Sequence, residues 1–193
     1  MEIIRSFIAI ELPDSLKQNL NTLKTHLKKL TPPGTKWVNS KSIHLTLKFL
    51  GHINAERTGE ITKVITDTTS NILLFNLKIG GVGAFPDWNR VQVIWVGISG
   101  DIDKLLMLQQ KIEDGLSPLG FTPETRKFTP HLTLARLNRE ITADKRQNFG
   151  QLVSKTELTL SDEIKVSGIS LMKSELTRAG AIHHCISFIK LKR

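Results

Sequence analysis

The sequence predicts an α+β fold with two pseudo-symmetric lobes of antiparallel sheet, flanked by helices, around a central cleft. A four-residue string, His-Leu-Thr-Leu, occurs twice, at residues 44–47 and 131–134. Both copies alternate polar and apolar residues with the period of a strand, and both follow a helical segment. The repetition predicts two structural units that each supply an equivalent strand. Because no linker separates them, we expect one bilobal domain over residues 1–193.

The chain opens with a predicted strand at residues 5–12 and then a helix. Pro13 and Asp14 occupy its first turn, where proline and acidic residues are favoured. Around His26, the lysines Lys24, Lys28 and Lys29 are expected to form a solvated face. Thr-Pro-Pro-Gly ends the helix. One apolar face is predicted from leucines at steps of three and four, namely Leu16, Leu20, Leu23, Leu27 and Leu30.

The first copy of the string is expected to follow a short strand at Trp37 and Val38. Gly51 is predicted to close the strand of the first copy, which leaves His52 in a loop with a structural role. A second helix is predicted at 55–70, with Ile61, Val64 and Ile65 buried. Strands at 73–83 and 91–98 then flank a turn at 84–90.

The second half repeats the alternation of helix and strand. A third helix is predicted at 101–116, with its N-cap near Ser99 or Asp101. The segment 121–128 leads into the second copy of the string, and 138–153 is predicted to form a fourth helix. Two final strands, at 163–173 and 182–190, are expected to form a hairpin through a turn at 175–180.

Composition excludes several classes of protein. Hydrophobic content of 39% and charged content of 23% are typical of a globular chain rather than a disordered one. We find no apolar run long enough to span a membrane and no signal peptide. The single cysteine, Cys185, excludes an internal disulfide and favours a reducing cytoplasm. The net charge of +9 favours polyanionic partners, nucleic acid first.

The two copies of the string carry the candidate catalytic residues. On a strand, residues two apart share a face, so His44 lies beside Thr46 and His131 beside Thr133, with the leucines on the opposite face. A single strand histidine is usually structural. Two equivalent strands facing each other would instead bring two imidazoles and two hydroxyls together.

Such a set suits in-line displacement at phosphorus. One imidazole takes a proton from the attacking water, and the other gives a proton to the departing oxygen. The hydroxyls can bind the non-bridging oxygens. Arg136 could add a bidentate clamp. On a regular strand, however, it would point away from His131, so it reaches the site only if the strand twists or ends.

Other chemistries fit the sequence less well. His44 and His131 lack acidic neighbours on their faces for a metal site. His183 and His184 are adjacent, so they point to opposite faces of a strand, and Cys185 is expected in the core. Glycines at 80–83 are not followed by a helix, as a nucleotide-binding loop requires, and no serine nucleophile motif is present.

With both motifs and their flanks in view, the chain resembles the 2H phosphoesterase superfamily, and within it the RNA 2′,3′-cyclic phosphodiesterases, also called 2′-5′ RNA ligases. The likeness runs almost end to end. It rests on residues 5–13, on Trp37 with 44–51, on 85–86 with 90–97, on 128–136 and on 171–176.

This resemblance implies a metal-independent hydrolase without a cofactor that opens a terminal 2′,3′-cyclic phosphate on RNA and leaves a 2′-phosphate. It implies that His44 is the proton donor to the 3′ oxygen and His131 the acceptor that activates water. Thr46, Thr133 and Arg136 would bind the phosphate. We therefore expect a cytoplasmic monomer whose partner is RNA or an oligonucleotide with a cyclic phosphate end, and no membrane contact.

One departure and two alternatives accompany this resemblance. The last hairpin of the family often carries a tyrosine, whereas this chain has none and has His183 and His184 there. The same residues could catalyse the reverse reaction, 2′-5′ ligation of RNA, although mass action in water favours hydrolysis. A third possibility is an RNA-binding module without turnover, which a turnover assay distinguishes.

Overall fold

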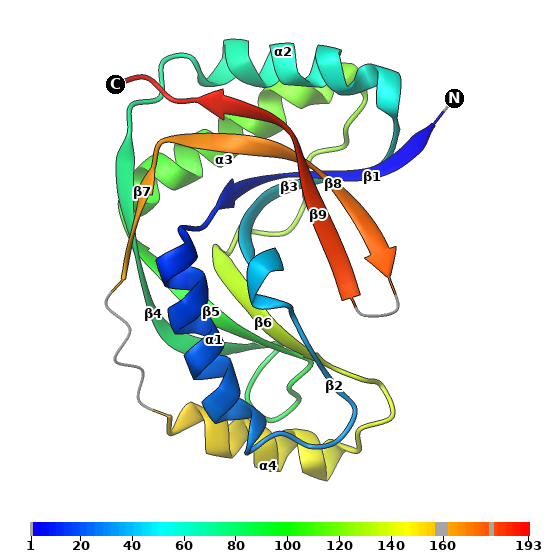
Figure 1. The fold of residues 1–193 in the computed structure, drawn as a ribbon, viewed down its shortest axis with the longest axis vertical. Coiled ribbons are helices and arrows are strands. Elements are labelled where there is room, and N and C mark those ends of the chain that lie inside the picture. Colours follow the sequence, from blue (N-terminus) through cyan, green and yellow to red (C-terminus); the bar gives the residue numbers. More distant parts are fainter. Residues whose placement is uncertain (1, 157–161, 178–179) are drawn as a thin grey trace.

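The computed structural model describes residues 2–156, 162–177 and 180–193 and has two antiparallel sheets with four α-helices (Figure 1). The first sheet has the strand order β3-β1-β8-β9, and the second β2-β6-β5-β4-β7. This confirms the predicted α+β fold with two lobes. The first sheet contains β1 (Ile3–Glu11), β3 (His44–Asn54), β8 (Gly168–Thr177) and β9 (Gly180–Lys190). The second contains β2 (Thr35–Trp37), β4 (Phe75–Phe85), β5 (Val93–Gly100), β6 (His131–Leu137) and β7 (Glu163–Val166).

Three of the four helices lie at opposite ends of the molecule, and the fourth crosses a sheet. In Figure 1, α2 (Thr58–Thr69) and α3 (Ile102–Leu116) lie along the top, beside the first sheet, and α4 (Ala143–Ser154) lies at the bottom, beside the second. The helix α1 (Asp14–Lys28) crosses in front of the second sheet in this view. Its predicted apolar face is confirmed, because four of the five leucines assigned to that face are buried.

Both motif strands have the predicted alternation. Leu45 and Leu47 are buried, as are Leu132 and Leu134, while the histidines and threonines between them are partly exposed. The leucines join one apolar cluster that includes residues of both sheets. Burial of the leucines therefore fixes the opposite face of each strand, and the side chains on it, toward the space between the lobes.

A bulge in each motif strand changes the direction of the side chains after the threonine. In β3, Thr46 pairs with Ala9 and Lys48 with Ile8, which leaves Leu47 as an extra residue. In β6, Leu134 is the extra residue in the same way. The bulge resets the alternation, so Phe49 and Arg136 return to the face that carries the histidine and threonine. The strand is therefore not regular here, and the condition under which Arg136 is expected to reach the cavity is met.

The strand β3 is longer than expected and does not close at Gly51. It continues to Asn54, because a second bulge at Leu50 and a left-handed Gly51, with φ of 72°, carry it past this point. His52 therefore lies in the strand, opposite Arg5, and not in a loop.

Two further expectations need correction near the C-terminus. The segment predicted as one strand at 163–173 divides at Ser167, so that β7 pairs with β4 in the second sheet and β8 with β1 in the first. The hairpin of β8 and β9 is confirmed, but the turn predicted at 175–180 is too long, because the strands pair as far as Thr177 and Gly180; residues 178–179 lie outside the described residues. Cys185 is exposed and not in the core, because it lies on β9 at the edge of its sheet.

Lysine burial also differs from expectation. Lys24, expected on the solvated face of the first helix, is buried, with 7% of its surface exposed. Its ammonium group donates to the Val38 carbonyl and the Ser40 hydroxyl. These bonds compensate the burial of the charge and attach α1 to the segment before β3.

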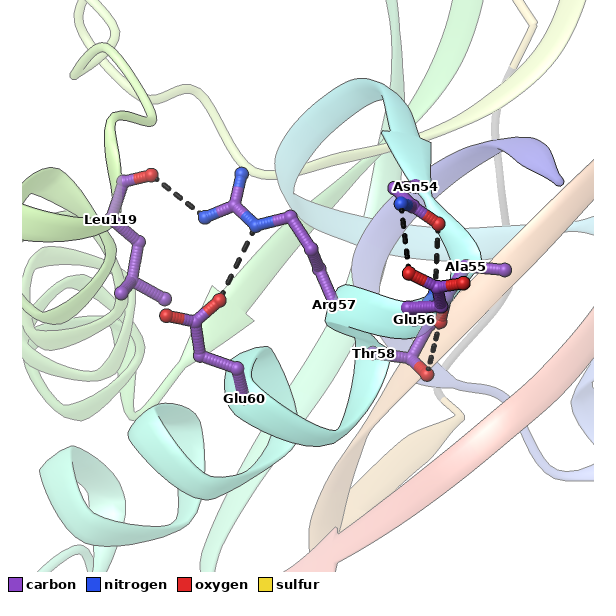
Figure 2. Close-up of polar contacts among 7 residues, drawn as sticks. All are labelled: Asn54, Ala55, Glu56, Arg57, Thr58, Glu60 and Leu119. Carbon is purple, nitrogen blue, oxygen red and sulfur yellow. Dashed lines mark hydrogen bonds and ion pairs between the residues drawn. The ribbon is translucent and has the colours of Figure 1, made fainter. Parts of the chain in front are cut away.

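The start of α2 is attached to the segment that follows α3 (Figure 2). Arg57 donates to the Leu119 carbonyl at 2.9 Å and to the Glu60 carboxylate at 3.3 Å, and its guanidinium lies over the Phe121 ring. The Asn54 side chain accepts from the Glu56 amide at the turn before the helix. These contacts hold the first residues of the connection that leads to the second motif strand.

Candidate active site

A single cavity between the two sheets brings the predicted site residues together. It has a volume of about 360 Å³ and opens to solvent. Its lining includes the five residues singled out from the sequence: His44 and Thr46 from β3, and His131, Thr133 and Arg136 from β6. The two motif strands, far apart in the sequence, therefore present their polar faces to one space.

The two histidines are held in the same way. The Nδ1 atom of His44 lies 2.8 Å from the Ser42 carbonyl, and the Nδ1 atom of His131 lies 2.7 Å from the Thr129 carbonyl. A carbonyl can only accept, so each Nδ1 carries a hydrogen and donates it. In the neutral ring this leaves Nε2 without a hydrogen, as an atom that can take up or deliver a proton.

The His44 ring lies among other rings. It stacks on Phe7 with centroids 4.5 Å apart, and His183 meets it edge-on at 4.9 Å. Burial lowers the pKa of His44 to about 4, with smaller contributions from the charges of His183 and Lys17. The hydrogen bond to Ser42 acts in the opposite direction. In the free protein at neutral pH, His44 is therefore uncharged.

The His131 ring has a different surrounding. Phe85 meets it edge-on at 4.9 Å, and Trp95 lies 6.1 Å away. Burial lowers the pKa of His131, and the positive charge of Arg136 lowers it further. A permanent cation therefore accompanies the second histidine within the cavity and favours its neutral form.

Sequence reasoning gave no role in the site to two residues that surround the motifs, although it noted His183 in the last hairpin. Phe7 lines the cavity because residues 5, 7 and 9 of β1 share a face, which the alternation of that strand could have indicated. His183 enters the cavity from β9, and its buried Nδ1 has no hydrogen-bond partner within the described structure. Neither residue has a spacing relative to the His-x-Thr strings that would have identified it.

A buried ion pair also lies directly behind the first motif. The Lys48 ammonium group contacts the Glu113 carboxylate of α3, and both side chains are almost completely buried. Lys48 also donates to the Thr122 carbonyl, and Gln109 donates to Glu113. Lys48 therefore links the first motif strand to the segment that precedes the second.

Two other kinds of feature bear on function, metal-ligand clusters and membrane-spanning helices. Among the described residues, no three His, Cys, Asp or Glu side chains gather in a way that could hold a metal ion. None of the described helices is long and apolar enough to cross a membrane.

Two sheets facing each other, each with a His-x-Thr strand directed into one cavity, define a protein of the 2H phosphoesterase class. The chain belongs to the 2′-5′ RNA ligase superfamily, whose family model matches residues 12–178. Among its curated relatives is the RNA 2′,3′-cyclic phosphodiesterase of Methanothermobacter thermautotrophicus, 29% identical over 97% of this chain and 99% of that protein. The RNA 2′,3′-cyclic phosphodiesterase of Aquifex aeolicus is 30% identical over 95% of each chain.

Solved structures confirm the fold. The crystal structure of Escherichia coli LigT complexed with 3′-AMP superposes with a TM-score of 0.76 over the whole of both chains, at 22% identity. Protein TT0787 of Thermus thermophilus gives a TM-score of 0.75, covers 97% of this chain and 98% of its own, and is also 22% identical.

Proposed function

We propose that this protein hydrolyses 2′,3′-cyclic phosphate ends of RNA to 2′-phosphates by metal-independent acid–base catalysis with two histidines. The observation that carries the proposal is the matched pair of imidazoles in one cavity, each held through Nδ1 and each with Nε2 available. The names of the relatives that align along nearly the whole chain support the substrate.

In this mechanism His131 is the proton acceptor. Water attacks phosphorus while its proton passes to Nε2 of His131, which requires this ring to be neutral beforehand. Burial and the Arg136 charge lower the pKa of His131, which supports this role. The arginine also screens the negative charge that the attacking oxygen brings to the phosphate.

His44 is the proton donor. Its Nε2 hydrogen passes to the 3′ oxygen as the bond from that oxygen to phosphorus breaks, leaving a 3′ hydroxyl and a 2′-phosphate. The free ring has a pKa of about 4, so it needs the negative phosphodiester beside it to become protonated near neutral pH. Substrate binding would thus create the acid that the reaction consumes.

Three side chains would hold the phosphate between the two rings. Thr46 and Thr133 line the cavity at equivalent positions, and their hydroxyls can donate to the two non-bridging oxygens. Arg136 can add a charge-assisted hydrogen bond. These donors would stabilise the transition state most, because the non-bridging oxygens are then most negative.

Phosphorus NMR of an oligonucleotide with a 2′,3′-cyclic phosphate end, in excess EDTA, tests this proposal. We expect a 2′-phosphate as the product. A 3′-phosphate would contradict the assigned roles, and activity lost with EDTA would contradict a metal-independent mechanism. Ligation would consume the cyclic phosphate end together with the 5′ hydroxyl of a second RNA and give a joined 2′-5′ diester in place of a 2′-phosphate. An RNA-binding module would give no product with the wild type, while His44→Ala keeps its RNA affinity and salt dependence.

We also propose that the chain acts as a cytoplasmic monomer with a single domain over residues 1–193. All five candidate site residues come from one chain, and one apolar cluster joins both sheets. Light scattering should give the mass of one chain, and unfolding should show one transition for both lobes.

A further inference from the structure

The proposed reaction fixes the side of the cavity from which RNA must leave. In a cyclic phosphate the departing 3′ oxygen belongs to the same ribose that carries the rest of the chain. Water attacks opposite that oxygen, so His131 faces the water and His44 faces the ribose. The nucleotides that precede the reacting end therefore lie on the His44 side, a placement that rests on the proposed function.

A second and larger hollow adjoins the cavity on that side. It has a volume of about 1030 Å³ and lies between α1 and the segment 37–41. Trp37, Val38 and Asn39 line both this hollow and the catalytic cavity, so the two hollows share one wall. The Lys17 charge, on its wall, contributes to the low pKa of His44, which agrees with this proximity.

The wall of this hollow is rich in lysine. Four lysines line it, Lys17, Lys24, Lys28 and Lys41, against one acidic residue, Asp14. We call this surface the lysine groove. The Asp14 carboxylate is 93% exposed and lies 3.5 Å from Lys17, a distance and exposure typical of a weak ion pair. Among the described residues, no carboxylate pairs with Lys28 or Lys41, so their charges are available to a ligand.

The groove is also held in shape by its own contacts. Lys24 donates to the Val38 carbonyl at 3.1 Å and to the Ser40 hydroxyl at 2.6 Å, and that hydroxyl donates to Asn21 of α1 at 2.7 Å. These bonds cross the groove floor and attach the 37–41 segment to the helix. The exposed lysines on the two sides of the groove therefore lie on elements that are hydrogen-bonded to each other.

The hollow on the other flank has a different character. It has a volume of about 640 Å³, reaches His131 and the later residues of β3 from Thr46 onward, and is lined largely by apolar groups such as Phe85 and Phe128. Its charged lining is Arg126, Lys127 and Glu124, apart from Lys48, which Glu113 neutralises. It lies on the side from which water attacks, and it offers less positive charge to a phosphate backbone.

We infer that the RNA chain preceding the cyclic end runs along the lysine groove, where Lys17, Lys28 and Lys41 contact its phosphates. The protein would then discriminate an oligonucleotide from a mononucleotide by contacts outside the catalytic cavity. Binding of the longer substrate would release counterions from its backbone, and KM would rise steeply with salt.

The test compares a 2′,3′-cyclic mononucleotide with an octanucleotide that ends in the same cyclic nucleotide. We expect the octanucleotide to have the lower KM. In the double variant Lys28→Gln/Lys41→Gln, the ratio of the mononucleotide KM to the octanucleotide KM should fall about tenfold. The slope of log KM against log salt for the octanucleotide should fall by about 1.4, since each single-strand phosphate contact contributes about 0.7.

Two control variants make the test specific. Lys63→Gln/Lys145→Gln removes two exposed lysines of α2 and α4 that line neither hollow, and it should leave the KM ratio and the salt slope as in the wild type. Arg126→Gln/Lys127→Gln removes the cations of the opposite flank. The inference is overturned if this last variant removes the advantage of the octanucleotide, or if the wild type shows no such advantage. Absence of turnover on both substrates would reject the proposed function itself.

Discussion

The two motif strands are alike in backbone and different in two side chains. Both contain His-Leu-Thr-Leu, both bulge at the second leucine, and both bind the histidine Nδ1 to the carbonyl two residues earlier. The two residues after the string are Lys48 and Phe49 in the first lobe and Ala135 and Arg136 in the second. The repeat therefore supplies two equivalently held imidazoles, and the residues after each string give them different surroundings.

The inequality has a chemical meaning in the proposed mechanism. Arg136 returns to the cavity face and keeps a positive charge beside His131, whereas Phe49 at the equivalent position brings no charge to His44. In that mechanism Arg136 would help to keep His131 neutral until water attacks, whereas a bound phosphodiester could protonate His44 without repulsion from an adjacent arginine. Under the proposed function, this one difference after the bulge would distinguish the proposed base from the proposed acid.

The largest effect that we predict is on stability. It concerns Lys48, which follows the first string at the position that Ala135 has after the second. Lys48→Met should lower the free energy of unfolding by about 3 to 5 kcal/mol, because it leaves the buried Glu113 carboxylate without its cation. Lys48→Met combined with Glu113→Leu should recover most of this loss. Urea unfolding measures both.

An exposed ion pair provides the control. Lys78 and Glu163 lie 3.4 Å apart, and each is more than half exposed, so Lys78→Met should cost less than about 1 kcal/mol. Equal losses for Lys48→Met and Lys78→Met would contradict a special contribution of the buried pair to stability.

Next in size, we expect His44→Ala and His131→Ala each to lower kcat by at least about a hundredfold without unfolding the protein. A p-nitrophenyl phosphodiester separates their roles, because its leaving group departs without a proton. On that substrate His44→Ala should retain a larger fraction of wild-type activity than His131→Ala. The opposite order would exchange the assignments of acid and base.

The arginine should matter less than either histidine. Arg136→Gln is expected to lower kcat/KM by about thirtyfold, and Arg136→Lys by less, because lysine keeps the charge but not the fork of donors. Loss of the charge should also raise the pKa of His131, so the basic limb of the kcat/KM profile should move to higher pH. Phe49→Gln should leave that limb in place, since Phe49 carries no charge.

The smallest expected difference is between two pH profiles of the wild-type enzyme, those of kcat/KM and of kcat. The active free enzyme needs a charged His44, whose pKa is about 4, and a neutral His131, whose pKa lies below 6.5. The profile of kcat/KM against pH should therefore be a bell with its maximum between about 4 and 6.5. The kcat profile should lie at higher pH, because the bound phosphodiester raises the pKa of His44. Coincident profiles would contradict this coupling.

The sequence predicted the parts of the fold that depend on short-range periodicity. The α1 leucines and the motif leucines follow helix and strand periods, so their burial and the facing of His44 and His131 could be predicted. The bulges could not, because nothing in Leu47 or Leu134 differs from an ordinary strand residue. The orientation of Arg136 depends on such a bulge, so its approach to the site could be stated only as a condition.

Other features depend on contacts between distant segments. Lys24 and Lys48 resemble surface lysines in the sequence and are buried because Val38, Ser40 and Glu113 arrive from elsewhere in the chain. The division of 163–173 at Ser167 requires partners in two sheets, which local pattern does not reveal. Sequence periodicity therefore predicts which face of a strand is polar, while pairing decides which groups that face meets.

The strand order implies that the two sheets are completed at different times during synthesis on the ribosome. By the time residue 166 has emerged, all five strands of the sheet that holds His131 exist, whereas the sheet that holds His44 still lacks β8 and β9. β1 lies between β3 and β8, so one of its edges stays unpaired until β8 is synthesised, more than half the chain later. The nascent protein is thus expected to complete its second lobe first, and an exposed edge early in translation makes the N-terminal strand the segment on which a chaperone would act.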